Sequence, residues 1–160
     1  MNTTDICIRC GSKCCRSTPP ALTKDDIIQI EKHIQGTDWL MEIKEGEFVV
    51  AKKPNSNDCF FLNEKGLCLI YEFRPIDCKL FPFFVKIRKL TAAKFSIEWR
   101  IWFCPLTNQI GLEELYMEAR KTIIELLNHD PTILFEYQKV LYSSGGYKRK
   151  HFWRKEIITI

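Results

Sequence analysis

Residues 7–15 read Cys7-Ile8-Arg9-Cys10-Gly11-Ser12-Lys13-Cys14-Cys15, which places four cysteines close together near the start of the chain. The two residues between Cys7 and Cys10 let the backbone turn so that both sulfurs face one ion. Cys14 and Cys15 are adjacent, and neighbouring side chains generally diverge. They therefore serve different sites, or one sulfur stays outside the coordination shell. This spacing predicts a metal site around which the chain folds.

Four more cysteines, Cys59, Cys68, Cys78 and Cys104, are too far apart in sequence to chelate an ion locally, so the fold must gather them. Eight thiols permit two four-sulfur sites, or one cluster with four thiols left for another ion or for reactivity. One or two cysteines could instead be small buried hydrophobes. Thiolates suit both zinc and iron–sulfur clusters, and Cys104-Pro105 resembles the last ligand of bacterial ferredoxin motifs. A [4Fe-4S] cluster is therefore slightly favoured, while zinc, or one site of each kind, stays open.

The first twenty residues contain no apolar run of the signal-peptide type, and no later stretch approaches the roughly 20 apolar residues of a membrane span. We therefore expect a cytoplasmic protein with no membrane partner. A reducing compartment keeps thiols free, so eight cysteines indicate metal ligands more than four disulfides.

The formal net charge is +4, and residues 139–160 alone contribute +5, from six basic residues and Glu156. The cysteine-bearing body before position 139 is therefore nearly neutral. The basic tail from Lys148 to Lys155 also contains Phe152 and Trp153, a mixture that could contact nucleic acid. The solvated end of a β-strand is the favoured interpretation.

Thr23 is expected to cap a helix that begins at Lys24, with Asp26 completing a capping box and Gly36 ending the helix. One face of this helix is apolar and is expected to cover the first cysteine cluster. The residues of this face are Ile27, Ile30 and Ile34.

Strands are expected over residues 47–52, 83–90 and 94–103, where β-branched residues or an alternation of apolar and polar residues occur. Residues 59–62 and 67–70 flank the turn-forming Asn63-Glu64-Lys65-Gly66, which predicts a hairpin with one cysteine on each arm. Such a turn would bring Cys59 and Cys68 together.

Apolar residues at helical spacing predict an amphipathic helix over 112–127 and a second helix from Pro131 to about Tyr142. With 160 residues, 46% of them hydrophobic, the chain is expected to form a single α+β domain. Short antiparallel strands and loops would surround the cysteine sites, and helices would cover them. Within it, residues 1–106 would form the metal-binding region and residues 107–160 a helical extension with a basic tail.

Four segments resemble the CxxCxxCC cysteine-cluster proteins of the YkgJ type, described as zinc- or iron-chelating domains. They are Cys7-Ile8-Arg9-Cys10-Gly11 with Cys14-Cys15, the helix start Leu22-Thr23-x-x-Asp26-Ile27, the run from Cys68 through Arg74-Pro75-Ile76-Asp77-Cys78 to Pro82, and Cys104-Pro105. The likeness spans about residues 7–105 and implies metal binding. Two departures stand out: three residues, not two, separate Cys10 from Cys14, and Lys79 replaces a common arginine. A similar domain occurs in flagellin lysine N-methylases, which implies protein methyl transfer as an alternative.

Arg74 is the candidate cofactor-binding residue, because its guanidinium could contact a sulfur-bound cluster, an anion or an acidic partner. A salt bridge to Glu72 or Asp77 that anchors the loop is the structural alternative. His33, His129 and His151 show no metal-like spacing.

Closed zinc sites would indicate a structural or interaction role, including a zinc-stabilised module with a nucleic-acid-binding tail. An iron–sulfur cluster would indicate electron transfer, sensing or assistance to an enzyme, with a protein or redox partner. Whether the chain is itself an enzyme stays open.

Overall fold

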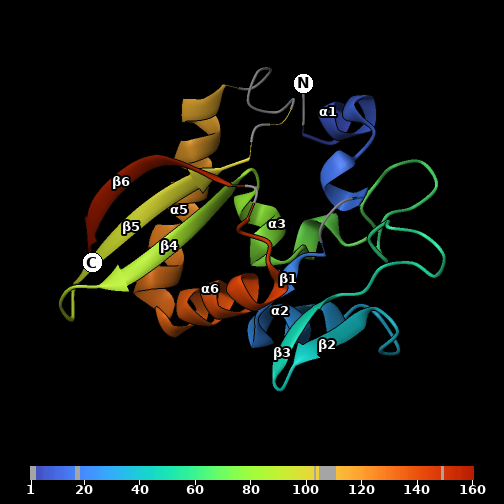
Figure 1. The fold of residues 1–160 in the computed structure, drawn as a ribbon, viewed down its shortest axis with the longest axis horizontal. Coiled ribbons are helices and arrows are strands. Elements are labelled where there is room, and N and C mark those ends of the chain that lie inside the picture. The colour runs from blue at the N-terminus through green and yellow to red at the C-terminus, as the bar shows by residue number, and fades with distance from the viewer. Residues whose placement is uncertain (1–2, 17–18, 103, 105–110, 149) are drawn as a thin grey trace.

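The computed structural model describes residues 3–16, 19–102, 104, 111–148 and 150–160. Two three-stranded antiparallel sheets and several helices give the predicted small α+β domain (Figure 1). The helices are α1 Thr3–Cys10, the 3-10 helix η1 Lys13–Arg16, α2 Lys24–Glu31, the 3-10 helix η2 Tyr71–Phe73, α3 Ile76–Leu80, α5 Leu112–His129 and α6 Thr132–Ser144. The strands are β1 Ala21–Leu22, β2 Leu40–Lys44, β3 Glu47–Val50, β4 Phe83–Lys89, β5 Lys94–Ile101 and β6 His151–Thr159. The expected boundary at residues 106 and 107 lies outside the described residues.

The larger sheet has the strand order β4-β5-β6, with both pairs antiparallel. The alternation that predicted β4 and β5 turns one set of side chains toward α5, where Trp99 meets Tyr116 edge-on. The third strand, β6, begins at His151 and so includes most of the basic tail, as the favoured interpretation of that tail expects. The basic tail is therefore mostly a sheet strand.

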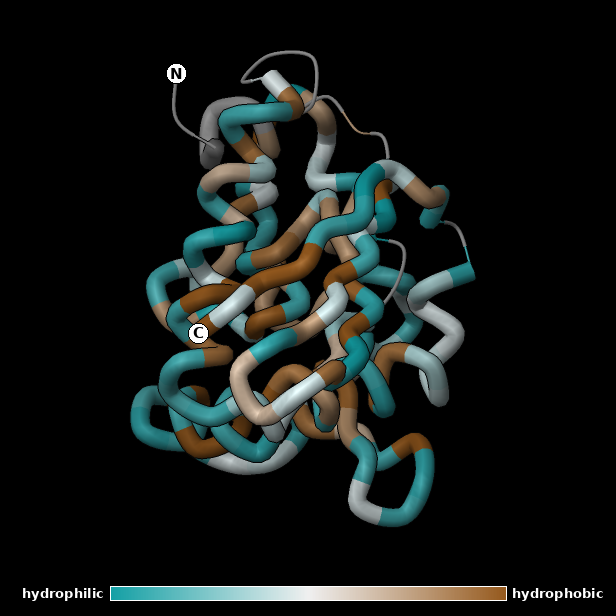
Figure 2. Tube along the Cα trace, turned by 90° about the vertical axis from the view of Figure 1, so that its left-hand side faces the viewer, coloured by the Kyte–Doolittle hydropathy of each residue, from teal (hydrophilic) through white to brown (hydrophobic). Residues whose placement is uncertain are grey.

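Both predicted C-terminal helices are present. Helix α5 buries the apolar stripe that includes Ala119 and Ile123, and α6 ends where Gly145 adopts a left-handed φ of 76°. Helix α6 packs against β1, β3 and β4, so it contacts both sheets. In Figure 2 the hydrophobic stretches run through the middle of the molecule and hydrophilic stretches form many of the outer turns. Among the described helices, none combines the length and the apolar character needed to cross a membrane.

Helix α2 begins as predicted, with Thr23 and Asp26 forming a complete capping box. It ends at Glu31, so the prediction that Gly36 ends it is wrong. The chain leaves the helix through a tighter turn, in which the His33 N–H donates to the Ile30 carbonyl at 3.0 Å. The His33 ring, just beyond the end of the helix, stacks on Phe73 with a centroid distance of 4.2 Å.

Helix α2 packs against β1 and η2. The prediction that it covers the first cysteine cluster is wrong. Its buried Ile30 joins a smaller apolar cluster, which comprises Leu22, Ile30, Trp39, Val50, Phe61 and Ile70. Cys59 and Cys68 pack against this cluster. The helix thus supports the second group of cysteines.

The smaller sheet has the order β1-β3-β2. Its central strand, β3, was predicted but stops at Val50, and only an isolated bridge between Lys52 and Cys59 continues the pairing. The sequence did not indicate the other two strands, because β1 has two residues and β2 shows no regular alternation of buried positions.

Two carboxylates join the N-terminal half of the chain to α3. Asp26 accepts the Ile76 N–H at 3.1 Å. Asp77 accepts the Ala21 N–H and the Tyr137 hydroxyl, both at 2.9 Å. Because these bonds converge on α3 from β1, α2 and α6, they fix the position of the helix that carries Cys78.

We expect Asp26 to make stability fall as pH rises. Burial raises the pKa of Asp26 to about 6, whereas an unfolded chain has its ordinary value of 3.8. Between these values the folded chain keeps a proton that the unfolded chain has lost, so the free energy of unfolding should be about 1 kcal/mol larger at pH 5 than at pH 7 from this group.

Denaturant unfolding of Asp26→Asn at both pH values measures this contribution. The exposed Asp25→Asn variant is the matched control and should keep the pH dependence of the wild type. A pH dependence in Asp26→Asn equal to that of the wild type would contradict the assignment.

Candidate metal centre

The first four cysteines lie on α1 and η1, which are separated by a tight reversal. Helix α1 ends where the Ser12 N–H donates to the Cys7 carbonyl at 2.9 Å and the Gly11 N–H donates to the Ile8 carbonyl at 3.1 Å. Gly11 and Ser12 both have positive φ, 75° and 52°. This is a Schellman ending, and it turns the chain back so that Cys14 follows on η1.

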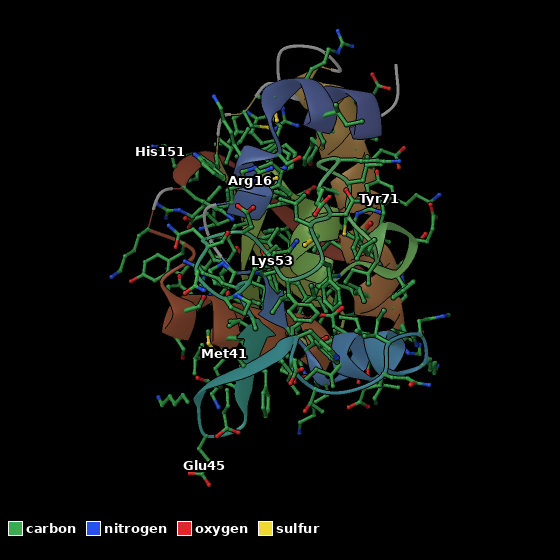
Figure 3. All side chains as sticks on the ribbon, turned by 90° about the vertical axis from the view of Figure 1, so that its right-hand side faces the viewer. Arg16, Met41, Glu45, Lys53, Tyr71 and His151 are labelled. Atoms are coloured by element: carbon green, nitrogen blue, oxygen red, sulfur yellow. The ribbon has the colours of Figure 1, made fainter. Side chains whose placement is uncertain are left out.

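Three hydrogen bonds join this N-terminal segment to the loop that carries Cys59 and Cys68. Arg16 pairs with Asp58 at 2.6 Å, and the Cys59 N–H donates to the Cys15 carbonyl at 2.7 Å. The buried Ser12 hydroxyl donates to the Gly66 carbonyl at 2.8 Å. These three hydrogen bonds therefore hold the segment with Cys14 and Cys15 against the loop with Cys59 and Cys68. Figure 3 shows this side of the molecule, with Arg16, Lys53 and Tyr71 labelled and sulfur atoms in yellow among the side chains between them.

Cys59 and Cys68 lie in two turns of the same kind. The Cys59 carbonyl accepts the Leu62 N–H at 3.0 Å, and the Cys68 carbonyl accepts the Tyr71 N–H at 3.4 Å. The predicted hairpin between them is present as an isolated bridge between Leu62 and Cys68, without regular strands. The two cysteines are close, as expected from the turn.

Two backbone N–H groups act on the sulfurs of these two turns. Burial raises the pKa of Cys59 and of Cys68, whereas the Phe61 N–H lowers that of Cys59 and the Ile70 N–H lowers that of Cys68. Phe61 and Ile70 are both buried in the smaller apolar cluster. Each turn therefore anchors an apolar side chain in the core and places an N–H near a sulfur, which stabilises the thiolate form.

Cys78 joins Cys59 and Cys68 from α3. Burial raises the pKa of Cys78 well above its ordinary value, and the charges of Asp77, Cys59, Cys15 and Cys68 act in the same direction. Burial also raises the pKa of Cys59 to about 12, opposed by the backbone N–H near its sulfur. These thiols are close enough to disfavour one another's ionisation.

Cys7 lies among a second set of thiols. Burial, followed by the charges of Cys10, Cys15 and Cys104, raises the pKa of Cys7 to about 11, while Arg74 lowers it. The Cys10 thiol donates to the Cys7 carbonyl at 3.3 Å. The structure thus brings Cys104, distant in sequence, to the N-terminal cysteines.

The adjacent Cys14 and Cys15 connect the two sets. Cys14 donates a hydrogen bond to Cys15, which raises the pKa of Cys14 and lowers the pKa of Cys15. The Arg16 charge also lowers the pKa of Cys15. Cys15 interacts electrostatically with Cys7, Cys59, Cys68 and Cys78 as well. Among these thiols, Cys15 is the one whose surroundings favour the thiolate.

None of the eight cysteines forms a disulfide in this structure. The interactions above link all the predicted ligands into one neighbourhood, and the list is Cys7, Cys10, Cys14, Cys15, Cys59, Cys68, Cys78 and Cys104. Within the described parts of the chain, no three Cys, His, Asp or Glu side chains already have an arrangement that could hold an ion. The assignment of each sulfur to a metal therefore stays a prediction.

Arg74 faces this neighbourhood. It forms neither expected salt bridge: its Nη1 donates to the Tyr71 carbonyl at 2.7 Å, and its guanidinium lies 4.1 Å from the Tyr71 ring centroid. Asp77 is used elsewhere, by Ala21 and Tyr137. The Arg74 charge lowers the pKa of both Cys7 and Cys68. Arg74 is thus placed to compensate negative charge on sulfur.

Sequence reasoning missed Ser12, Asp58 and the N–H groups near the two sulfurs. The repeated pattern of a cysteine followed two positions later by a large apolar residue, in Cys59-Phe60-Phe61 and Cys68-Leu69-Ile70, could have indicated the matched turns. The phenylalanines that are close to the cysteines in sequence fall into two groups: Phe60 and Phe61 belong to the smaller apolar cluster, whereas Phe83 and Phe84 belong to the main core.

Comparison with known proteins gives a family match over residues 6–105, to the CxxCxxCC model described as "Putative zinc- or iron-chelating domain". "Uncharacterized protein MJ0661" of Methanocaldococcus jannaschii is 31% identical over 159 residues, covering 90% of this chain and 84% of that protein. "Uncharacterized protein MJ0939" of the same organism is 33% identical over 88 residues, covering 51% of this chain but 30% of its own length. No solved structure matches.

We expect Gly66→Ala to loosen the N-terminal segment. Gly66 has a φ of 77°, and an added Cβ would lie 3.3 Å from the Ser12 Oγ. Gly36 has a φ of 76° with nothing within 4 Å of such a Cβ, so Gly36→Ala is the matched control. Both variants should lose about 1 kcal/mol of stability from backbone strain. Only Gly66→Ala should lose hydrogen-exchange protection in residues 7–16, and equal protection in both variants would contradict this contact.

Proposed function

Because this chain belongs to the CxxCxxCC family of zinc- or iron-chelating domains, we propose that its cysteines hold an iron–sulfur cluster used in electron transfer or sensing. The proposal places the protein in the cytoplasm, where thiols stay reduced. It needs ligands that are not tied up in disulfides, that lie close together and that are prepared for the thiolate form. All eight cysteines meet the first requirement.

The observation that carries the proposal is the matched pair of turns at Cys59 and Cys68, in which each cysteine carbonyl accepts the N–H of the residue three positions later. In both turns the backbone N–H two residues after the cysteine lowers the pKa of that cysteine. Backbone N–H groups near sulfur stabilise negative charge there and tune the potentials of iron–sulfur clusters. Packing alone would require only the buried Phe61 and Ile70.

Three features favour a cluster over zinc alone. Sulfur predominates around the described thiols: the charges that act on Cys7, Cys59 and Cys78 come mostly from other cysteines, and His33 is stacked on Phe73. The chain holds twice the four thiols that one zinc ion requires. Arg74 adds a cation beside Cys7 and Cys68, which suits a site that carries net negative charge.

The chain's own residues would bind and shield the group. The raised pKa values of Cys7 and Cys59 mean that both thiols must lose a proton on binding, with Cys15 the most readily ionised neighbour. Phe60 and Phe73 pack against the same apolar cluster as Cys59 and Cys68, and this apolar surface would limit water access. A bound iron–sulfur cluster supplies one-electron chemistry.

Anaerobic purification of the full chain, followed by metal and acid-labile sulfide analysis and visible absorption, tests the proposal. We expect equal molar amounts of iron and acid-labile sulfide. We also expect a broad absorption band near about 400 nm, which is typical of thiolate-bound clusters. Cys68→Ser should lose most of the iron, whereas Leu69→Ala, an exposed neighbour, should keep it. Stoichiometric zinc in a colourless protein would overturn the proposal.

We expect Arg74→Gln to lower the reduction potential of the cluster by on the order of 50 mV, because reduction adds negative charge and the variant lacks a nearby cation. Arg74→Lys keeps the charge and should shift the potential less. Redox titration followed by visible absorption measures both variants, with metal content as the control. A potential unchanged in Arg74→Gln, with iron retained, would restrict Arg74 to anchoring the loop.

A further inference from the structure

The two faces of the larger sheet have different surroundings. On one face Glu156 accepts hydrogen bonds from Trp99 at 3.0 Å and from the Tyr116 hydroxyl at 2.8 Å, and Arg120 pairs with it at 3.0 Å. These contacts join β5 and β6 to α5. In Figure 1 the opposite face of the sheet is turned toward the reader, and no labelled helix lies over most of it. We call this the open face.

The strand register determines which side chains share the open face, because residues paired across an antiparallel sheet point to the same side. Its three cross-strand rows are Lys86–Glu98–Lys155, Arg88–Ser96–Ile157 and Phe84–Arg100–Phe152. The first row carries basic residues on two strands, and each of the other two rows combines one basic residue with an exposed apolar residue. The third row begins under α6, where Phe84 meets Tyr142 edge-on.

The charge of the open face is strongly positive. Glu98, the single acidic residue in these rows, pairs with Arg100 at 2.9 Å. Lys86, Arg88 and Lys155 are exposed, and no ion pair involving them is found among the described residues. Three uncompensated cations on one sheet face attract a polyanion.

Exposed apolar side chains lie among these cations. Phe152 is 60% exposed and Ile157 is 62% exposed. Tyr142 is 38% exposed, and its ring lies 4.5 Å from that of Tyr147. An exposed aromatic ring offers a nucleobase a surface for stacking, which a carboxylate-bearing protein does not need.

A β-bulge divides the basic tail between the two faces. The register shifts between the Trp99–Arg154 and Arg100–Phe152 pairs, so Trp153 is the additional residue. Trp153 packs on Phe83, and Arg154 pairs with Glu113 against the Tyr116 ring. Phe152 and Lys155 face the other way. Only part of the tail therefore contributes to the open face, and β4 and β5 supply the remaining cations.

We propose that the open face of the β4-β5-β6 sheet binds single-stranded nucleic acid. Lys86, Arg88 and Lys155 contact the phosphates, and Phe152 stacks on a base. Neither role involves a cysteine, so the proposal is independent of the metal. A single strand is favoured over a duplex because its bases are free to stack on a side chain.

Fluorescence anisotropy with a labelled oligo-uridine 12-mer, using the full chain with its metal, tests the proposal. Lys86→Ala combined with Lys155→Ala should weaken binding and reduce the salt slope by about 1.4, since each phosphate contact to a single strand contributes about 0.7. Phe152→Ala should weaken binding roughly tenfold and leave the salt slope unchanged. Lys32→Ala combined with Lys121→Ala removes the same charge from exposed sites outside the sheet and should bind as the wild type does.

Absence of wild-type binding at low salt would overturn the proposal, as would equal weakening by the control pair. Displacement of the 12-mer by poly-glutamate at an equal concentration of charge would also overturn it, in favour of an acidic protein partner. Each variant is checked for metal content and thermal unfolding, so that a folding defect is separated from a binding defect.

Discussion

Thiolates repel one another, and this fold brings eight cysteines into one electrostatic neighbourhood. Burial and the neighbouring sulfurs raise the pKa of Cys7, Cys59 and Cys78, so ionising the set together is unfavourable without a compensating cation. The chain offers partial compensation through Arg74, Arg16 and the N–H groups of two turns. A bound metal would compensate the remaining negative charge, because its positive charge lies at the sulfur atoms themselves.

The surrounding structure holds the thiols in place against this repulsion. The bonds from Ser12, Arg16 and Cys15 join the N-terminal segment to the loop that carries Cys59 and Cys68. Asp26 and Asp77 fix α3 from the other side. The backbone and the buried carboxylates thus hold these segments together, so the cysteine thiols are not needed to do so and can serve as metal ligands.

Much of the fold could be predicted from local patterns. The alternation in β4 and β5, the apolar stripe of α5 and the capping box of Thr23 and Asp26 depend on neighbours in sequence, and the structure confirms them. Strand β1 and the place of β6 in the sheet depend on distant partners, so short propensity patterns did not reveal them. Likewise, the spacing of Cys7 and Cys10 indicated a site, but the link between Cys14 and Cys15 needed coordinates. The end of α2 at Glu31, ahead of Gly36, was not indicated by the position of that glycine.

The Tyr137 hydroxyl on α6 donates to Asp77, immediately before Cys78. Residue 137 lies beyond the segment that the family model matches, so Cys78 is positioned partly by a helix outside that segment. During translation, the helix bearing Cys78 lacks this hydrogen bond until α6 has been synthesised. The final placement of Cys78 therefore depends on nearly the whole chain being present.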